Sequence, residues 1–128
     1  MGIEIINQCP DEVVAELAVR AVHQQAFGIV HGGVYCSLVE TVASLGAWLN
    51  AHARGQSLLG LENSTSFIRA VKGGRLCAVA KPITRGRRTQ AWEVAIRSDN
   101  GHIAAVGHVR FICLSDAERA SVASTDFV

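Results

Sequence analysis

The stretch His31-Gly-Gly-Val-Tyr-Cys-Ser-Leu-Val-Glu40-Thr-Val-Ala-Ser44-Leu-Gly-Ala-Trp-Leu-Asn50 decides the fold of this chain. It predicts a glycine turn followed by one helix of about five turns. Apolar or small side chains cover nearly the whole circumference of that helix, which is typical of a helix inside a soluble protein. These side chains are Val34, Leu38, Val39, Val42, Ala43, Leu45, Ala47, Trp48 and Leu49. Glu40 interrupts them, and it is the only Asp, Glu, Lys or Arg between Arg20 and Arg54.

Glu40 therefore needs an explanation, because a carboxylate is rarely buried without a partner. In one interpretation Glu40 reaches solvent or pairs with a base from elsewhere in the fold. In the other it lines a pocket and acts as a base or nucleophile whose reactivity is set by partial desolvation. The apolar surroundings favour the second interpretation.

The composition indicates one ordinary soluble domain. The chain has 128 residues, of which 49% are hydrophobic and 18% charged, and its net charge is +1. This balance argues against a nucleic-acid partner, and no membrane partner is expected. Between residues 54 and 97, nine Lys or Arg residues accompany two acidic ones. That local surplus can attract an anionic ligand, or it can form solvated strand faces.

Cysteine and histidine usage predicts a cytoplasmic protein without a metal site. The first residues lack a basic region followed by an apolar run, so no signal peptide is expected. The central helix is too short and too polar at Glu40 to span a membrane. Cys9, Cys36, Cys77 and Cys113 are isolated in the sequence, which predicts reduced thiols that pack as small hydrophobes. The histidines show no metal-ligand spacing, and no cofactor is expected.

Period-two alternation predicts strands on both sides of the helix. Residues 12–20 alternate between apolar and polar positions, as in a half-buried strand. The other strands are expected at residues 3–7, 57–69, 75–83, 90–98 and 102–114, with a break at Gly60. Short turns, including Asn100-Gly101, require antiparallel pairing. We therefore predict an α+β domain over residues 1–114, in which five or six antiparallel strands curl around one central helix, and a poorly ordered tail at 115–128.

With these elements in place, the stretch His31–Ser44 resembles the signature of hotdog-fold acyl-coenzyme A thioesterases. It is most similar to the 4-hydroxybenzoyl-CoA thioesterase group of the Arthrobacter type, within the PaaI-like superfamily. The segments Phe67-Ile-Arg-Ala-Val-Lys-Gly-Gly-Arg-Leu76 and Pro82-Ile-Thr-Arg-Gly-Arg-Arg-Thr-Gln-Ala-Trp-Glu-Val94 also resemble strands of that group. The resemblance implies a hotdog fold that hydrolyses acyl-CoA. It also implies a homodimer as the minimal active unit, or a homotetramer built as a dimer of dimers, with active sites at subunit interfaces.

The same resemblance implies roles for four residues. Glu40 falls where the family has its catalytic carboxylate, which acts as nucleophile or as base toward water. Gly32 falls where a backbone N–H at the start of the helix polarises the thioester carbonyl. Gln25 matches a glutamine that helps to hold the reacting groups, and Ser44 matches a hydroxyl near the attacking water.

The chemistry of a helix start supports these roles from the residues alone. Free N–H groups and the positive end of the helix dipole can stabilise the oxygen that gains charge during hydrolysis. Gly32 and Gly33 permit a tight turn and a close ligand approach, although a turn can need glycine for its own conformation. His31 is a candidate general base, but bracing of the turn by its ring is the favoured role. Cys36, one helical turn before Glu40, is a weaker candidate for the nucleophile.

Spacing along the helix predicts a site shared between subunits. Glu40 lies about seven residues beyond the glycine turn, which is roughly 10 Å along the helix axis. One thioester would not easily contact both groups of a single helix. Two antiparallel copies of the helix would bring Gly32 of one subunit near Glu40 of the other.

Binding of coenzyme A is assigned to basic residues and to a glycine backbone. Arginines in a glycine-containing turn can hold phosphates, and the choice among them stays open. The candidates are Gly33, Arg69, Arg85, Arg87 and Arg88. Trp48 and Trp92 are interpreted as core residues.

Three functions are compatible with this sequence. The first is an acyl-CoA thioesterase that acts on an aromatic or otherwise bulky acyl group. The second is a hotdog-fold hydratase or dehydratase, which needs a histidine and a carboxylate at the acyl α and β carbons, whereas His31 leads directly into the glycine turn. The third is a non-catalytic acyl-CoA-binding domain, which gains nothing from a poorly solvated Glu40.

Overall fold

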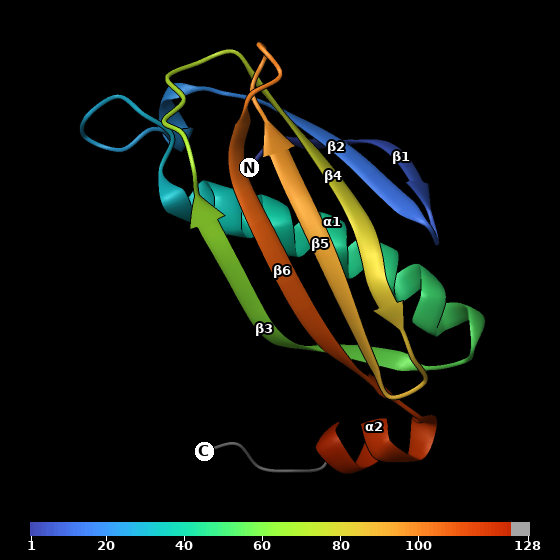
Figure 1. Ribbon diagram of the computed structural model, residues 1–128. Helices are drawn as coiled ribbons and strands as arrows, with labels where there is room; N and C mark the ends of the chain where they lie inside the picture. The colour runs from blue at the N-terminus through green and yellow to red at the C-terminus, as the bar shows by residue number, and fades with distance from the viewer. Residues whose placement is uncertain (124–128) are drawn as a thin grey trace.

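Six antiparallel strands form one sheet in the computed structural model, which describes residues 1–123 (Figure 1). Their order across the sheet is β1-β2-β4-β5-β6-β3. The strands are β1 Ile3–Cys9, β2 Glu12–Ala18, β3 Ser57–Phe67, β4 Arg75–Arg85, β5 Thr89–Arg97 and β6 Ile103–Leu114. All six strands were predicted, and their ends lie within a few residues of the expected positions.

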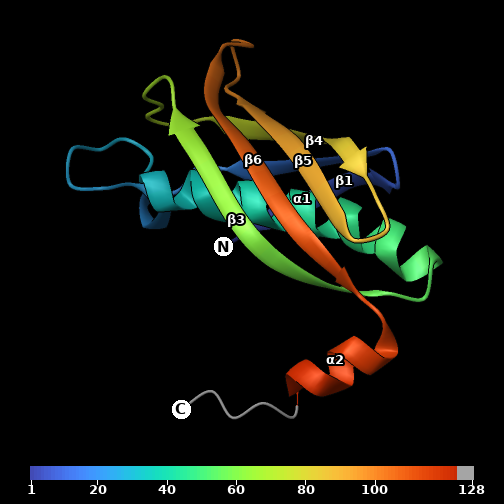
Figure 2. The ribbon, with the colours of Figure 1, turned by 60° about the horizontal axis from the view of Figure 1, so that its bottom comes forward.

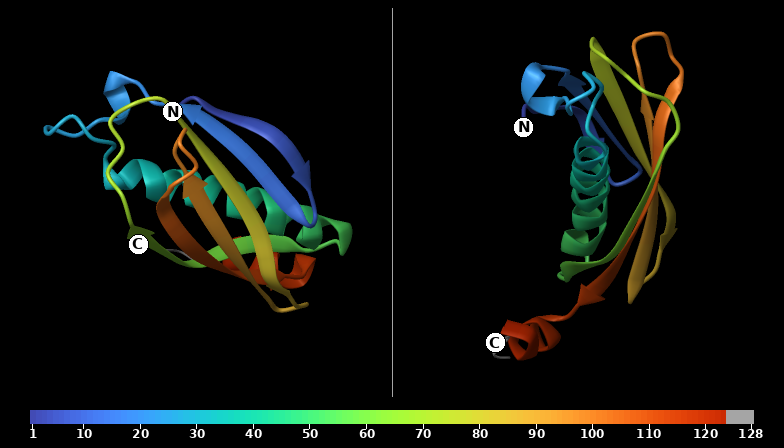
Figure 3. Two further views of the ribbon diagram at one scale, coloured as in Figure 1. Left: turned by 45° about the horizontal axis from the view of Figure 1, so that its top comes forward. Right: turned by 90° about the vertical axis from the view of Figure 1, so that its left-hand side faces the viewer.

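One long helix, α1 (Gly32–Ala53), lies along the concave face of this sheet (Figures 2 and 3). Its buried side chains recur at helical spacing on the side that faces the sheet. They include Val34, Leu38, Val39, Val42 and Ala43. The opposite side carries Thr41 and Trp48, which are exposed. The helix is therefore less enclosed within one chain than its composition predicts.

The two tryptophans differ in environment, and only one was interpreted correctly. Trp92 is fully buried against Gly46 of α1, where a Cβ would lie 2.5 Å from the indole ring. The indole Nε1 donates to Gln90 Oε1 at 2.9 Å, and Gln90 Nε2 donates to Ala47 O at 3.0 Å. Trp48 is 46% exposed, so its assignment to the core is wrong. It lies on the side of α1 that the sheet does not cover.

Strand β3 forms one edge of the sheet and pairs with β6 alone. The pairing register shifts between Gly60 and Glu62, close to the break expected at Gly60. Leu59 and Leu61 on this strand are 44% and 50% exposed. An unpaired edge that carries exposed leucines is a surface on which another chain can dock.

The C-terminal segment differs from the expectation of a poorly ordered tail at residues 115–128. A second helix, α2 (Asp116–Ala123), follows β6, with Asp116 and Glu118 in its first turn near the positive end of the helix dipole. A periodicity of only two turns is too short to be recognised in the sequence. The remainder of that tail, residues 124–128, lies outside the described residues.

Three expectations about cysteines, membrane spans and metal ligands can be compared with the structure. All four cysteines are free, but only Cys113 is buried, so packing as a small hydrophobe holds for that residue alone. No helix within residues 1–123 is long and apolar enough to cross a membrane. Among the same residues, no cluster of three or more potential ligands could hold a metal ion.

Candidate active site

Helix α1 begins directly after His31, which caps it. The His31 Nδ1 atom accepts a hydrogen bond of 2.8 Å from the Gly33 amide. Gly32 and Gly33 belong to the first helical turn and neither has a positive φ, so the expected glycine turn before the helix is wrong. No acceptor in the described part of the chain takes a hydrogen bond from the Gly32 amide, which leaves this donor free at the helix start.

A close contact explains the glycine at position 32. A Cβ on Gly32 would lie 2.6 Å from the Phe67 ring, at the end of β3. At Gly33 a Cβ would lie 3.0 Å from His31 Nδ1. At both positions a neighbouring ring approaches the backbone closely, so a larger side chain would require that ring to move. Sequence alone does not distinguish this close approach from a turn that requires positive φ.

Glu40 is half-buried where α1 faces β3, and each of its carboxylate oxygens accepts one hydrogen bond. Ser44 Oγ donates to Glu40 Oε2 at 2.8 Å, from one turn further along α1. Asn63 Nδ2 donates to Glu40 Oε1 at 3.3 Å, from the neighbouring strand. None of the ion pairs found within residues 1–123 involves Glu40. The structure thus gives this carboxylate neutral donors rather than a basic partner.

Asn63 and Thr65 belong to the same cluster, and sequence reasoning missed both. Asn63 Nδ2 also donates to the carbonyl oxygen of Cys36, at 3.1 Å. Thr65 Oγ1 donates to Asn63 Oδ1 at 2.7 Å. The signal that was available is the polar run Glu62–Ser66, which is unusual in a strand next to an apolar helix.

A cavity near the start of α1 is lined by the other group of predicted site residues. Its volume is about 250 Å³, and its lining includes Gln25, Gly32, Tyr35, Phe67 and Arg69. Gln25 Oε1 accepts a hydrogen bond of 2.6 Å from the Phe27 amide. The structure therefore brings Gln25, Gly32 and Arg69 together. Glu40 and Ser44 are not among the lining residues.

Tyr35 places an unusual polar atom beside this cavity. Only 3% of its surface is exposed, and within residues 1–123 its hydroxyl has no hydrogen-bond partner. Its ring is tilted against that of Phe67, with centroids 5.9 Å apart. Burial raises the pKa of Tyr35 above its ordinary value, which keeps the phenol neutral.

The arginines that were expected to bind coenzyme A lie at opposite ends of α1. Arg69 lies at the start of the helix, where its Nη1 donates to His102 Nδ1 at 2.9 Å. Arg85 lies near the helix end and forms an ion pair of 2.5 Å with Asp11. Arg54, just after α1, donates to the carbonyl oxygen of Gly86, which holds the β4–β5 turn there. Arg87 and Arg88 are exposed in that turn.

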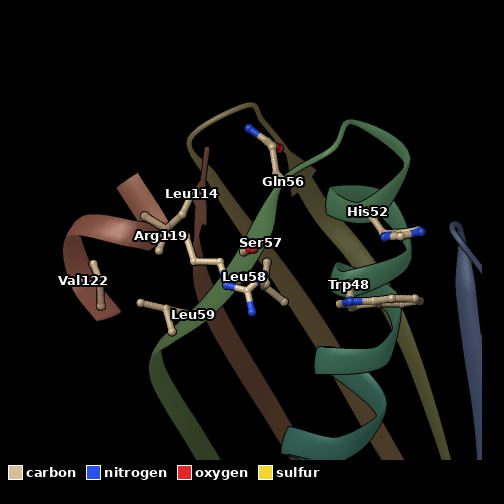
Figure 4. Close-up of a pocket in the computed structure, with 9 residues that line it drawn as sticks. All are labelled: Trp48, His52, Gln56, Ser57, Leu58, Leu59, Leu114, Arg119 and Val122. Atoms are coloured by element: carbon tan, nitrogen blue, oxygen red, sulfur yellow. The ribbon is translucent and has the colours of Figure 1, made fainter. Parts of the chain in front are cut away.

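A larger cavity, of about 460 Å³, lies between the end of α1, the start of β3 and helix α2 (Figure 4). Trp48 and His52 stack on one wall with ring centroids 4.6 Å apart, and Arg119 and Val122 approach from α2. None of the predicted catalytic residues lines this cavity. Within one chain it is therefore separate from the Glu40 carboxylate.

Comparison with known proteins identifies the class. The profile of a family described as the thioesterase superfamily matches residues 27–105. The chain is also 42% identical, over 112 residues, to the Mycobacterium tuberculosis protein Rv1847, covering 86% of this chain and 80% of that protein. The chain belongs to the thioesterase superfamily. Its activity is accordingly that of a thioester hydrolase, and the predicted hotdog fold is confirmed.

The chain is similar to three further proteins or solved structures of this kind. The solved structure of Rv1847/MT1895 superposes with a TM-score of 0.87 at 38% identity, covering 89% of this chain and 92% of that chain. The proofreading thioesterase EntH of Cronobacter turicensis is 36% identical over 79% of this chain and 73% of its own length. The thioesterase SAV0944 of Staphylococcus aureus, in a glutamine-to-alanine variant, has a TM-score of 0.83 at 30% identity, with coverage of 88% and 93%. A second variant of SAV0944 has a glutamate replaced by alanine.

Proposed function

We propose that this protein is a cytoplasmic acyl-CoA thioesterase of the Arthrobacter-type 4-hydroxybenzoyl-CoA group. It hydrolyses the thioester of an aromatic or otherwise bulky acyl group to the free acid and coenzyme A. No cofactor takes part, because coenzyme A belongs to the substrate. The observation that carries this proposal is the Glu40 carboxylate, which is half-buried, held through both oxygens and paired with no cation of the described chain.

Glu40 can cleave the thioester in two ways. As a nucleophile, it attacks the carbonyl carbon, the C–S bond breaks and the coenzyme A thiolate leaves, after which water hydrolyses the resulting anhydride. As a general base, it takes a proton from water, the hydroxide attacks the carbonyl carbon, and the proton passes to the departing sulfur. In both routes the free Gly32 amide supplies a donor for the oxygen that gains charge.

We also include Gln25 in the proposed active site, because of its position in the structure and its separation from Glu40 in the sequence. Gln25 lines the cavity at the start of α1 together with Gly32. The residues replaced in the two SAV0944 variants are a glutamine at position 32 and a glutamate at position 47 of that chain. Their separation is 47 − 32 = 15 positions, which equals 40 − 25 for Gln25 and Glu40. We therefore assign Gln25 to holding the reacting groups.

The two catalytic groups belong to different subunits in this proposal. Gly32 and Glu40 are eight positions apart in one helix, roughly 12 Å along its axis. The free edge of β3 supports a homodimer, because antiparallel pairing of two β3 strands would set two α1 helices antiparallel. The Gly32 amide of one subunit would then approach the Glu40 carboxylate of the other.

A homotetramer, formed as a dimer of such dimers, is proposed on the outer face of the sheet. Half-buried aliphatic side chains stand opposite one another across four neighbouring strands there. They are Val14, Val79, Ala95 and Val106. This apolar row offers a surface on which a second dimer can pack.

The phosphates of coenzyme A are assigned to the exposed basic side chains. Arg87 and Arg88 in the β4–β5 turn are the strongest candidates, because Arg85 is already paired with Asp11. Arg69 lines the cavity that contains Gly32 and is placed to contact the substrate there. Gly33 contributes only its small size, since its amide is bound by His31.

The alternatives lose support at His31 and Glu40. A hydratase or dehydratase needs a histidine that is free to move protons, whereas His31 Nδ1 caps the helix. An acyl-CoA-binding domain has no use for a carboxylate held in position by two donors.

The test is hydrolysis of benzoyl-CoA, phenylacetyl-CoA and medium-chain acyl-CoA, with thiol release followed for the wild type and for Glu40→Gln. We expect Glu40→Gln to lose at least about 100-fold in kcat, as for removal of a catalytic base. Glu62→Gln, the same chemical change at an exposed position of β3, is the matched control. If the wild type binds an acyl-CoA without hydrolysing it, the thioesterase proposal is wrong.

The shared site has its own test. Glu40→Gln subunits are mixed with Gly32→Val subunits, in which a side chain at position 32 meets the Phe67 ring. Mixed dimers contain one intact pair of groups, so activity should return on mixing two inactive proteins. Failure of activity to return in dimers shown to be mixed would place both groups in one subunit.

A further inference from the structure

We propose that Asn63 is a positioning residue that fixes the Glu40 carboxylate, and that Thr65 fixes the amide of Asn63. This inference rests on the proposed function of Glu40. It begins with the two hydrogens of one amide nitrogen. Asn63 Nδ2 lies 3.1 Å from the Cys36 carbonyl oxygen and 3.3 Å from Glu40 Oε1. Both acceptors lie on α1, one turn apart, so this amide connects the helix to the edge strand.

Thr65 determines which end of the amide faces the helix. Its hydroxyl donates to Asn63 Oδ1 at 2.7 Å. Only the oxygen of an amide can accept, and only its nitrogen can donate, so the three contacts agree on one orientation. Were the amide reversed, its oxygen would face the Glu40 carboxylate and the Cys36 carbonyl, which are both acceptors. Thr65 therefore acts on Glu40 through Asn63.

The irregular pairing of β3 brings these side chains to the helix. Gly60 lies opposite Phe111, and Asn63 lies opposite Val109, two buried residues of β6. Gly60 and Asn63 are three positions apart, so regular alternation would place them on opposite faces of the sheet. The extra residue of the bulge, Leu61, returns both to the helix side.

Gly60 confirms this orientation independently. A Cβ built on Gly60 would lie 3.7 Å from Glu40 Oε2, the oxygen that accepts from Ser44. Gly60 and Asn63 thus flank the same carboxylate from either side of the bulge. The glycine leaves space next to Oε2, while Asn63 holds Oε1.

The chemical consequence is a carboxylate with a fixed direction. The hydrogen bond from Ser44 fixes only one oxygen of Glu40, and it comes from the same helix. With that bond alone, the carboxylate could still rotate about its terminal torsion. Asn63 adds a tie to a second element of the fold. Because both donors are neutral, neither neutralises the charge with which Glu40 would attack or take a proton. Correct orientation of a reacting group contributes strongly to rate.

The test uses the isosteric change Asn63→Asp together with Asn63→Ala, assayed on the acyl-CoA that the wild type hydrolyses best. Loss of a hydrogen bond to a charged group should lower kcat about 10- to 100-fold. KM should change less than about threefold, because a positioning residue acts on the rate through Glu40. In Asn63→Asp the acidic limb of the pH–rate profile should also move to higher pH, since a second carboxylate disfavours ionisation of the first.

Substitutions at Thr65 test whether its hydroxyl acts on Glu40 through Asn63. Thr65→Val removes the hydroxyl with little change in shape, and it should lower kcat in the same direction as Asn63→Ala but less. Thr65→Ser keeps the donor and should restore most of the rate. Ser64→Ala, at the exposed position between the two residues, is the matched control and should resemble the wild type.

The outcomes separate this inference from the proposed function. If Glu40→Gln keeps its activity, the proposed function itself is wrong. If Glu40→Gln is inactive while folded Asn63→Asp and Thr65→Val keep both the wild-type kcat and the wild-type pH profile, only the role of Asn63 is wrong. Thermal unfolding and gel filtration of each variant identify those that fold. A fall in Tm with no change in kcat or pH profile would likewise overturn the positioning role.

Discussion

Helix α1 contacts the middle of the sheet with one side and the edge strand β3 with another, and the two sides differ in polarity and in packing. The side against the middle of the sheet is apolar and so tightly packed that glycine is needed: a Cβ on Gly46 or Gly107 would lie 2.5 Å from Trp92 or Val39, respectively. The side against β3 is polar, and Glu40 accepts one hydrogen bond from Asn63 of that strand. Figure 3 shows the helix against one face of the sheet. Close packing supplies stability, whereas the polar side leaves a carboxylate accessible for chemistry.

This contrast implies that stability and activity depend on different sides of one helix. Substitutions on the packed side should lower the free energy of unfolding and leave the rate per folded molecule almost unchanged. Substitutions of the polar residues on the β3 side should lower the rate per folded molecule and leave the free energy of unfolding almost unchanged. Trp92→Ala and Gly46→Ala address the packed side, and two predictions at Tyr35 address the helix start beside Phe67 of β3; all the expected effects are on stability.

Trp92→Ala should have the largest effect. Replacing a fully buried tryptophan by alanine costs about 3–5 kcal/mol, and here it also leaves Gln90 Oε1 without its donor. Urea unfolding measures the loss, with Glu40→Gln as the comparison, for which we expect a change below about 1 kcal/mol. Comparable losses in the two variants would contradict a division between the two sides.

Gly46→Ala should have an intermediate effect. The added methyl group would meet the Trp92 ring, and overpacking of this kind costs about 1–3 kcal/mol. Gly73→Ala is the matched control, because a Cβ there meets nothing within 4 Å and the backbone φ is not positive. Equal midpoints in urea for these two variants would show that the contact between α1 and Trp92 is looser than described.

Tyr35→Phe should have a smaller effect, of opposite sign. The buried hydroxyl has no partner within residues 1–123, so its removal should raise the free energy of unfolding by about 1 kcal/mol. The measurement is urea unfolding at neutral pH. A decrease instead would mean that the hydroxyl finds a hydrogen-bond partner in solution, for example in a second subunit.

Alkaline pH should reveal the smallest effect at the same residue. Burial raises the pKa of Tyr35 in the folded state above 10.0, the ordinary value that it has when unfolded. The unfolded chain therefore loses this proton first, so stability is retained below pH 10 and falls as the pH rises through the folded pKa. Urea midpoints measured from pH 9 to pH 11 should fall less steeply for Tyr35→Phe than for the wild type. An equal fall of the urea midpoint with pH in the two proteins would contradict the raised pKa of Tyr35.

Local patterns predicted much of this structure from the sequence. The alternation Val13, Ala15, Leu17 identified β2, because strand side chains point to alternate faces and those three are buried. The family resemblance assigned Ser44 together with Glu40, one helical turn apart on α1, and the structure joins the two side chains by a hydrogen bond. Both predictions depend only on residues close in sequence.

The rest depends on contacts between distant segments, which no local pattern encodes. Asn63 reaches Glu40 only because a one-residue bulge reverses the alternation of β3. The glycine at position 32 is explained by the Phe67 ring, 35 positions away (67 − 32), rather than by a turn. Trp48 looked like a core residue because the composition of α1 does not reveal that the sheet covers one side of it.

The bulge in β3 also has a consequence for how the gene can change in length. Leu61 is the extra residue, and it is half exposed. A gene that lost codon 61 would still encode a strand in which Asn63 lies opposite Val109, because regular pairing would simply resume. Loss of codon 64 would instead turn Thr65 to the other face of the sheet, away from Asn63. Within this strand, position 61 is where evolution can delete a residue without disturbing the carboxylate opposite.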